Sequence, residues 1–187
     1  SKSGKEIWIQ ASYNPILDGA GKPVKVVKFA TDVTAEKNRN AEFEGKMSAV
    51  AKAQTMVEFN LDGTILTAND NFLSTLGYGL AELKGQHHRM FCDSAYAGSS
   101  EYAAFWQRMG RGEFAAGVYR YMGKGGREAW LQASYNPITD ASGKPYKVVQ
   151  FAIDITGQKQ AQNEVEKLIV AAAAGRLSDR IQTEQFK

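Results

Sequence analysis

The sequence predicts an α+β domain in which a five-stranded antiparallel sheet carries helices on one face, with coiled-coil helices flanking the domain. Three observations support this fold class. Residues 1–37 recur at residues 123–159 with 23 identities in 37 positions. Strand-like segments lie before and after one middle segment of helical spacing. The dipeptide Asp62-Gly63 separates two β-rich runs, as in a tight hairpin.

The repeat sets the domain organisation. An offset of 122 residues is too long for a solenoid, so the repeat indicates a duplicated domain whose first copy is truncated here. We expect residues 1–35 to be the last strands of that first copy and residues 36–55 to be a linker helix. Residues 50–157 then form the complete copy, and residues 158–187 form a further helix and the start of another module.

Strand and helix signals follow one another along the complete copy. The first hairpin is expected at Met56–Leu61 and Thr64–Ala68, because both runs are β-rich around the turn. Asn69 or Asp70 caps a short helix that Gly77 closes. The remaining elements are a helical turn at 81–85, a helix at 102–109 after a serine cap, and strands at 117–121, 128–138 and 146–155.

The last predicted strand is expected to face a pocket between the sheet and its helices. Side chains alternate between the two faces of a strand, so Val149, Phe151, Ile153 and Ile155 share one face. All four are apolar, and we therefore expect this face to line the core or the pocket.

Composition excludes several classes of protein. The 23 basic and 20 acidic residues are interspersed and leave a formal charge of only +3, which gives no indication of a nucleic-acid partner. A single cysteine, Cys92, excludes a disulfide scaffold and favours an intracellular, cytoplasmic protein. No apolar run reaches the roughly 20 residues of a membrane span, so no membrane insertion is expected of this segment.

Several short motifs resemble the landmarks of a PAS domain over about residues 50–157. They are Asn-Leu-Asp-Gly-Thr-Ile-Leu-Thr-Ala-Asn (60–69), Leu-Gly-Tyr (76–78), Leu-Lys-Gly (83–85) and the closing Asp154-Ile155-Thr156. His-His-Arg-Met-Phe (87–91), Phe105-Trp106, Gly-Glu-Phe (112–114) and Trp-Leu-Gln-Ala-Ser-Tyr-Asn-Pro-Ile (130–138) resemble more narrowly the paired PAS domains of bacterial methyl-accepting chemotaxis proteins, aerotaxis-type receptors included. The resemblance implies a PAS fold and a sensory role.

The resemblance also implies a route for the signal. In PAS domains the Asp-x-Thr signature couples the last strand to an output helix, and Asp154 with Thr156 matches it, as do Asp32 and Thr34 in the first copy. Apolar residues at 43, 47 and 50 and at 165, 169 and 172 form narrow stripes on the following helices. Such stripes favour pairing with a second copy, so we expect a homodimer.

The C-terminal residues imply the place of the segment in its parent protein. Residues 171–181 resemble the opening of a HAMP-like relay module of chemoreceptors. By the same resemblance, the parent would control a chemotaxis kinase with its coupling protein through a region beyond this chain.

The adjacent His87 and His88 are the candidates for metal chemistry. They are the only histidines of the chain, and a neutral imidazole is a common metal ligand. Some oxygen-sensing PAS domains hold haem b through a histidine placed before the long helix, and one axial ligand suffices. Adjacent helical residues point about 100° apart, so one of the two faces the pocket, with His88 favoured. A solvated or capping histidine is the alternative reading.

Flavin is the second cofactor candidate, and a cofactor-free pocket is the third. Trp106 and Trp130 resemble aromatic positions of flavin-binding aerotaxis PAS domains, where rings could flank the isoalloxazine of FAD; core packing is the other explanation. Phe151 and Ile153 would line the same site. Cys92 lacks the Asn-Cys-Arg-Phe-Leu-Gln context of photosensory flavin domains, which excludes a light-driven adduct.

No motif indicates catalysis. The glycine pairs at 110–112 and 123–126 lie at predicted turns and form no phosphate loop, and no zinc spacing or catalytic triad is present. The sequence therefore predicts a chemoreceptor input module that senses a small ligand, oxygen or redox state and is not an enzyme. The alternatives are a ligand-free dimerisation and spacer module, or the sensor of a histidine kinase or cyclic-dinucleotide enzyme.

Overall fold

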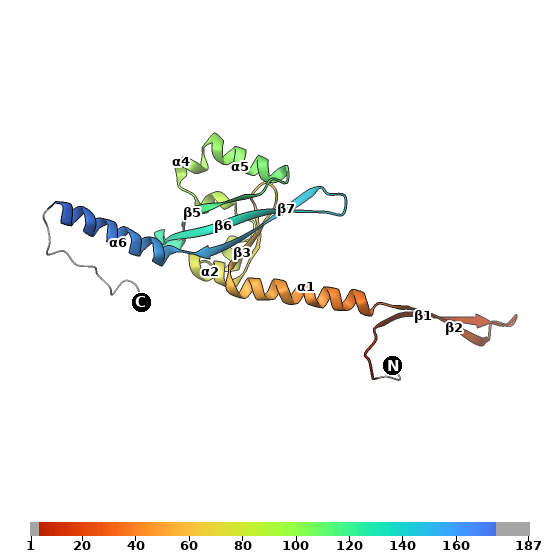
Figure 1. Cartoon of the computed structure of the whole chain (residues 1–187). Helices are drawn as coiled ribbons and strands as arrows, with labels where there is room; N and C mark the ends of the chain where they lie inside the picture. The colour runs from red at the N-terminus through yellow and green to blue at the C-terminus, as the bar shows by residue number, and fades with distance from the viewer. Residues whose placement is uncertain (1–3, 175–187) are drawn as a thin grey trace. The chain divides into compact units, whose positions relative to one another are not determined.

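A computed structural model describes residues 4–174 of the chain (Figure 1). The residues divide into two compact units, with the division between Val50 and Ala51, and each unit is described by itself. Within residues 4–174, no helix is long and apolar enough to cross a membrane. Of the residues that resemble the opening of a HAMP-like module, 171–181, those from 175 onward lie outside the described part.

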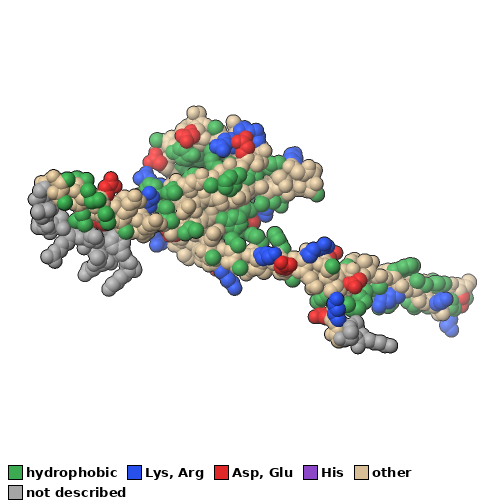
Figure 2. Space-filling view, viewed as in Figure 1, with side chains coloured by type: hydrophobic (Ala, Val, Ile, Leu, Met, Phe, Trp, Pro, Cys, Tyr) green, Lys and Arg blue, Asp and Glu red, His purple; other side chains and the backbone are tan. Residues whose placement is uncertain are grey.

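The first unit is a β-hairpin followed by a long helix. Strands β1 (Ile9–Leu17) and β2 (Pro23–Asp32) pair antiparallel, and α1 (Thr34–Ala53) follows. Almost every residue of this hairpin is exposed, including Trp8, Tyr13 and Phe29, and apolar side chains reach the molecular surface (Figure 2).

The second unit contains the expected five-stranded antiparallel sheet. Its strands are β3 (Thr55–Phe59), β4 (Ile65–Ala68), β5 (Ala115–Met122), β6 (Glu128–Thr139) and β7 (Pro145–Asp154), in the spatial order β4-β3-β7-β6-β5. The last strand, β7, therefore lies at the centre of the sheet, between β3 and β6. A displacement of β7 would change its contacts with both of these strands and the position of the helix that follows it.

The repeat seen in the sequence is also a repeat of structure. The pairs Ile9↔Asp32 and Leu131↔Asp154 occupy corresponding places in the β1–β2 and β6–β7 hairpins. Both hairpins shift register at the same point, at Ile16/Leu17 and at Ile138/Thr139, which are again 122 positions apart. The two copies thus encode the same hairpin, including its irregularity.

Helices connect β4 to β5 and cover one face of the sheet, as predicted. They are α2 (Asp70–Leu76), α3 (Leu80–Leu83), the 3₁₀ turn η1 (His88–Phe91), α4 (Ser94–Ala97) and α5 (Ser100–Gly110); a second 3₁₀ turn, η2 (Lys124–Gly126), joins β5 to β6. The predicted caps form: the Asn69 side chain accepts from the Phe72 N–H, and the Ser99 hydroxyl accepts from the Tyr102 N–H. The sequence analysis did not identify η1 and α4.

The core lies between this helical layer and the sheet. Leu131, Ala133 and Tyr135 alternate along the inner face of β6, and α5 contributes Tyr102, Trp106 and Met109 at helical spacing. The arrangement of α4 and α5 over the strands is visible in Figure 1. Aromatic rings fill much of this space, and their edge-to-face contacts fix the side chains that surround the functional site.

The face of β7 that points into the core differs from the prediction. Val148, Gln150 and Ala152 point inward and are buried, whereas Ile153 is 51% exposed and Phe151 is half-buried on the opposite face. The prediction was wrong because both faces of a central strand are largely apolar, so alternation did not distinguish them. The polar Gln150, which was not among the predicted core residues, is nearly inaccessible to solvent.

The predicted helix beyond the last strand is present as α6 (Thr156–Ala173). Its start is tied to the sheet, because the Trp130 N–H donates to the Thr156 hydroxyl and the Ile155 N–H donates to the Trp130 carbonyl. The end of β7 and the start of α6 are therefore one hydrogen-bonded joint.

Candidate functional site

The backbone at His87 and His88 is hydrogen-bonded to the β3–β4 hairpin. The His88 N–H donates to the Gly63 carbonyl, and Thr64 and His87 form an isolated bridge. Gly63 has a φ of 91° and lies against Trp106 and His87, so the turn approaches these rings closely. This contact directs His88 into the core, where it is 3% exposed, while His87 stays half-buried at the cap of η1.

His88 is the centre of a buried hydrogen-bonded group, which we call the His88 cluster: His88, Tyr102, Tyr121, Tyr135 and Gln150. The Nε2 atom of His88 lies 2.8 Å from the Tyr121 hydroxyl and 2.9 Å from the Tyr135 hydroxyl. The Nδ1 atom of His88 lies 3.0 Å from the Tyr102 hydroxyl. The two hydroxyls of Tyr121 and Tyr135 also contact each other, and the Gln150 amide donates to Tyr121 over 3.0 Å.

Burial keeps the His88 cluster uncharged. Desolvation, aided by nearby His87, lowers the pKa of His88 to about 3, so its imidazole is neutral at physiological pH. Desolvation also raises the pKa of Tyr121 and of Tyr135, so both remain phenols. A neutral imidazole offers one donor and one acceptor, and here both ring nitrogens have partners. Both ring nitrogens of His88 are therefore satisfied within the cluster.

The residues present do not fit haem. A haem iron needs an imidazole nitrogen with a free lone pair and an open space in front of it. Both nitrogens of His88 are engaged with tyrosines, and its ring lies 5.5 Å from the Phe59 and Trp106 rings. The Nδ1 atom of His87 accepts from the Arg89 N–H and lies 3.2 Å from the Tyr102 hydroxyl. Among residues 4–174, no three His, Cys, Asp or Glu side chains gather as metal ligands.

The predicted flavin residues are not brought together. Trp106 is buried in the core on α5, whereas Trp130 lies on the opposite face of the sheet. There its indole N–H donates to Glu128 and Lys159 lies 5.7 Å above its ring. Two tryptophans on opposite sides of a sheet cannot flank one isoalloxazine, so these residues do not fit FAD.

A cavity of about 240 Å³ opens beside His88. It is lined by residues of η1, α4, α5, β5 and β6 and by the two residues between η1 and α4: His88, Cys92, Asp93, Tyr96, Phe105, Val118, Tyr119, Arg120, Tyr121 and Tyr135. Its volume lies below the roughly 300–1,000 Å³ of pockets for drug-sized ligands. The cavity therefore suits a small molecule and not a dinucleotide or a porphyrin.

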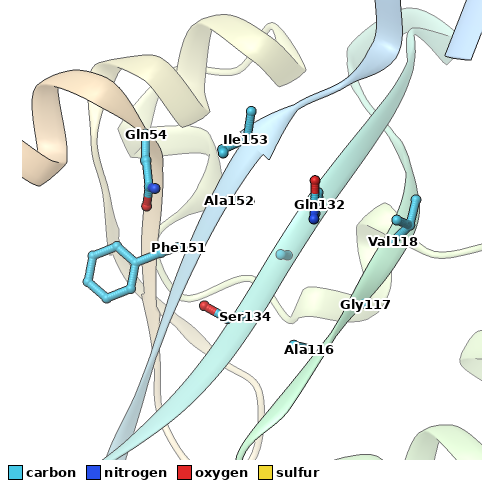
Figure 3. Close-up of a pocket in the computed structure, with 10 residues that line it drawn as sticks. Gln54, Ala116, Gly117, Val118, Gln132, Ser134, Phe151, Ala152 and Ile153 are labelled. Atoms are coloured by element: carbon cyan, nitrogen blue, oxygen red, sulfur yellow. The ribbon is translucent and has the colours of Figure 1, made fainter. Parts of the chain in front are cut away.

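Phe151 and Ile153 lie in a different place from the cavity. They project from β7 into a shallow hollow of about 320 Å³ on the outer face of the sheet, which Gln132 and Ser134 also line (Figure 3). The expectation that they line the pocket beside His88 was wrong because of the reversed face of β7. Their surroundings on this face are exposed.

The predicted relay residues form the same joint in both copies. The Asp154 carboxylate accepts from the Thr156 N–H over 2.9 Å, and Asp32 accepts from the Thr34 N–H over 2.9 Å. The Trp8 N–H donates to the Thr34 hydroxyl, as the Trp130 N–H does to Thr156. Hydrogen bonds from Thr34 lower the pKa of Asp32. Each joint thus links the preceding strand, the last strand and the first turn of a helix.

Comparison with known proteins agrees with this fold. The family model described as "PAS fold" matches residues 65–152. The chain carries a PAS domain. It is 46% identical over 156 residues to the biofilm dispersion protein BdlA of Pseudomonas aeruginosa, covering 83% of this chain and 37% of BdlA. It is 32% identical over 122 residues to the aerotaxis receptor of Escherichia coli, covering 65% of this chain and 23% of the receptor.

Solved structures show the same fold at lower identity. A PAS domain from Colwellia psychrerythraea matches 61% of this chain and 97% of its own length with a TM-score of 0.52 and 19% identity. A light-oxygen-voltage domain studied with a flavin analogue matches 66% of this chain and 96% of its own length with a TM-score of 0.50 and 21% identity. These likenesses show the PAS fold of the segment alone.

The sequence pointed to His88 but not to its partners Tyr102, Tyr121 and Tyr135, nor to Gln150, which is hydrogen-bonded to Tyr121. Tyr121 and Tyr135 lie on neighbouring strands, β5 and β6, where Tyr121 pairs with Ala129 and Tyr135 pairs with Ala115. Their backbones are therefore well apart along the strands, and only their hydroxyls meet, at His88. Gln150 could have been noticed as one polar residue in the otherwise apolar run Val148–Ala152. A glutamine at such a position is usually hydrogen-bonded inside the protein.

Proposed function

We propose that this chain is the sensory input segment of a cytoplasmic chemoreceptor-like protein and has no catalytic activity. In this proposal a small molecule in the cavity beside His88 changes the position of β7, and α6 carries the change away from the domain. The relatives support the proposal, because one is named for aerotaxis and the other for biofilm dispersion. The chain spans less than half of either relative, so control of a chemotaxis kinase and its coupling protein belongs to the proposal as well.

One observation carries the proposal: β7 is hydrogen-bonded to the cavity wall at its centre and to the output helix at its end. His88 and Tyr121 line the cavity, and the Gln150 amide joins Tyr121 to the centre of β7. Four residues further along, Asp154 at the end of β7 binds the first turn of α6. A ligand that repositions the Tyr121 hydroxyl thereby acts on the strand whose end fixes α6.

The helices on either side of the domain are suited to pass the change to a second copy. On α6, Val165 and Ile169 are 46% and 64% exposed, and on α1 Phe43 is 66% exposed. Apolar residues at this spacing pair with a twin helix in coiled coils. We therefore propose a homodimer in which the ligand favours one of two packings of α6, because a ligand that bound both equally would shift nothing.

The test is a substitution in the joint between β7 and α6. In a receptor that contains this segment, Asp154→Ala removes the carboxylate that binds Thr156 and should abolish ligand control of the kinase while the segment stays folded. Asp140→Ala is the matched control, since Asp140 also accepts hydrogen bonds from backbone N–H groups, but in the β6–β7 turn. Normal kinase control in Asp154→Ala, with a thermal midpoint equal to that of the control, would refute the proposed route.

A ligand-free spacer is the second candidate, and one observation favours it. The ring nitrogens and hydroxyls at the centre of the His88 cluster already have partners, so the core does not need a ligand to satisfy them. The two candidates differ in one measurement. A spacer shows the same separation of paired α6 labels whatever is added, whereas a sensor shows a separation that depends on the ligand.

A further inference from the structure

The cavity beside His88 opens along a free edge of the sheet. Strand β5 is the last strand in the order β4-β3-β7-β6-β5, so within the described residues 4–174 its one pairing partner is β6. Four consecutive residues of β5, Val118 to Tyr121, line the cavity. Small molecules can therefore enter between the edge of β5 and the segment that contains α4, without displacing a strand.

The wall of the cavity is aromatic. His88, Tyr96, Phe105, Tyr119, Tyr121 and Tyr135 all contribute rings to it. Phe105 stands edge-on to Tyr135 with ring centroids 4.8 Å apart, and Tyr119 stands edge-on to Tyr135 at 5.2 Å. Rings prefer such edge-to-face contacts with a further ring, and these contacts add to the gain from burying apolar area. The wall favours a flat, unsaturated ligand over an aliphatic one.

The groups that line the cavity interior are uncharged at neutral pH. Desolvation lowers the pKa of His88 to about 3 and raises the pKa of the Cys92 thiol to about 12. It also raises the pKa of Tyr96 and of Tyr119. An ionised ligand placed here would lose its hydration without meeting an opposite charge, which is costly.

The rim of the cavity carries one guanidinium and two carboxylates. Arg120 lies 3.7 Å from Asp93 and 3.8 Å from Glu128, and all three side chains are about half exposed. Two carboxylates around one guanidinium give these three groups a net negative charge, so the rim does not attract anions. A cation bound there would compete with Arg120 for the two carboxylates.

Two tyrosines of the cavity lining have hydroxyls that make no hydrogen bond to any residue in the range 4–174. They are Tyr96 and Tyr119, whereas Tyr121 and Tyr135 are engaged in the His88 cluster. Tyr96 and Tyr119 are half-buried, and neither hydroxyl is among the buried unpaired atoms, so both hydroxyls remain accessible. Each can donate to or accept from a polar group of a ligand. The site thus combines an aromatic wall with two neutral, accessible hydroxyls.

We propose that this cavity binds an uncharged aromatic molecule of one ring, or of two fused rings, that carries a hydroxyl or N–H group. The size agrees with this class, because a cavity of about 150 Å³ accommodates benzene and this one is larger by about one further small group. The inference rests on the proposed sensory function and names the ligand class of that site. In this proposal, an uncharged aromatic molecule occupies the pocket beside His88 in place of haem or flavin.

The test compares three probes of similar shape by titration calorimetry on the purified chain at pH 7: 4-methylphenol, 4-methylbenzoate and benzylammonium. We expect 4-methylphenol to bind at least tenfold more tightly than either charged probe. Equal binding of 4-methylbenzoate or benzylammonium, or no binding of 4-methylphenol, would overturn the inference.

Two variants locate the binding site. Tyr119→Phe removes one free hydroxyl and keeps the ring, so 4-methylphenol should bind roughly three- to tenfold more weakly, as expected for one lost hydrogen bond. Tyr146→Phe makes the same change at an exposed tyrosine of β7 that does not line the cavity, and should leave the affinity unchanged. Equal effects of the two substitutions would place the binding elsewhere.

The outcome separates this inference from the proposed function. Labels on α6 of the same protein report whether binding moves the helix. Binding of 4-methylphenol that is weakened by Tyr119→Phe, with unmoved labels, supports the site and contradicts the sensory relay. A relay that responds to another molecule while 4-methylphenol does not bind supports the function and contradicts the ligand class.

Discussion

The Gln150 amide lies 3.0 Å from the Tyr121 hydroxyl, and this hydrogen bond joins the centre of β7 to the His88 cluster. Gln150 is 1% exposed, and its carbonyl oxygen has no partner among residues 4–174. A buried amide with only half of its hydrogen-bonding capacity used contributes little to stability. In the proposed relay, Gln150 is the residue of β7 that is hydrogen-bonded to the cavity wall.

Replacing Gln150 by Met should therefore separate stability from signalling. The variant loses one hydrogen bond but also removes an unpaired buried carbonyl, so the free energy of unfolding should change by less than about 1 kcal/mol. Urea denaturation measures this change. Spin labels at Val165→Cys in a Cys92→Ala background should no longer respond to ligand. Gln132→Met, on the outer face of β6, is the control, and its spin labels should still respond to ligand. If the labels also respond in Gln150→Met, Gln150 does not connect the cavity to α6.

The two buried tyrosines should differ in their contribution to stability. Tyr135→Phe leaves His88 Nε2 with Tyr121 as partner, so we expect a loss of roughly 0.5–1.5 kcal/mol. Tyr121→Phe also leaves the Gln150 N–H without an acceptor, and should cost about 1–3 kcal/mol. Chemical denaturation of both variants gives the order. A larger loss in Tyr135→Phe would show that the hydrogen bonds of the cluster are distributed differently.

Acid should destabilise the domain through His88. Its pKa is near 6.5 in the unfolded chain and about 3 in the folded one, so below pH 6.5 the unfolded state binds the additional proton. The contribution of His88 to the free energy of unfolding is therefore complete above pH 6.5. It is lost as the pH decreases toward 3, by an amount of the order of 4 kcal/mol.

Urea unfolding between pH 7 and pH 4 measures this dependence on His88. Carboxylates with lowered pKa, such as Asp62 and Asp140, add a decrease of the same sign at lower pH. The comparison with His88→Gln therefore isolates the histidine, and this variant should show a shallower decrease between pH 6.5 and 4. His87→Gln, which alters a half-buried ring, should keep most of the wild-type slope. Identical slopes in wild type and His88→Gln would exclude a neutral buried His88.

The sequence predicted the fold because its signals were local and repeated. Asn69 and Ser99 cap their helices as expected, and Asp62-Gly63 turns the first hairpin. The repeat located the last two strands, since the same hairpin appears twice with the same register shift. These features depend on neighbouring residues, which a sequence displays directly.

The site was harder to predict because it depends on contacts between distant residues. Tyr102 and Tyr135 both reach His88, from positions 14 and 47 residues further along the chain. The face of β7 was misassigned because Phe151 and Ile153 are more apolar than the inward Gln150 and Ala152. When both faces of a central strand are apolar, hydrophobicity alone cannot decide which face points into the core.

The Gly63 turn should tolerate no side chain. Gly63 has a φ of 91°, and a Cβ there would lie 2.6 Å from the Trp106 ring and 2.9 Å from the His87 ring. Gly63→Ala therefore combines backbone strain of about 1–2 kcal/mol with overpacking of about 1–3 kcal/mol. Gly143→Ala is a matched control, because Gly143 has a φ of 84° but no atom within 4 Å of the added Cβ. Thermal and urea unfolding should show a clearly larger loss in the free energy of unfolding for Gly63→Ala than for Gly143→Ala. Equal losses would mean that the Trp106 ring leaves room for the added Cβ.

Cys92 should react slowly with thiol reagents in the folded protein. Burial raises the pKa of its thiol to about 12, and its sulfur lies 3.6 Å from the neutral Nδ1 atom of His88, which cannot stabilise a thiolate as a cation would. A thiolate is the reactive form, so alkylation by iodoacetamide at pH 8 should be at least tenfold slower in the folded chain than in urea. Addition of 4-methylphenol should slow it further, because Cys92 lines the same cavity. Fast alkylation of the folded chain would show that the cavity is open and polar at Cys92, which contradicts an uncharged aromatic site.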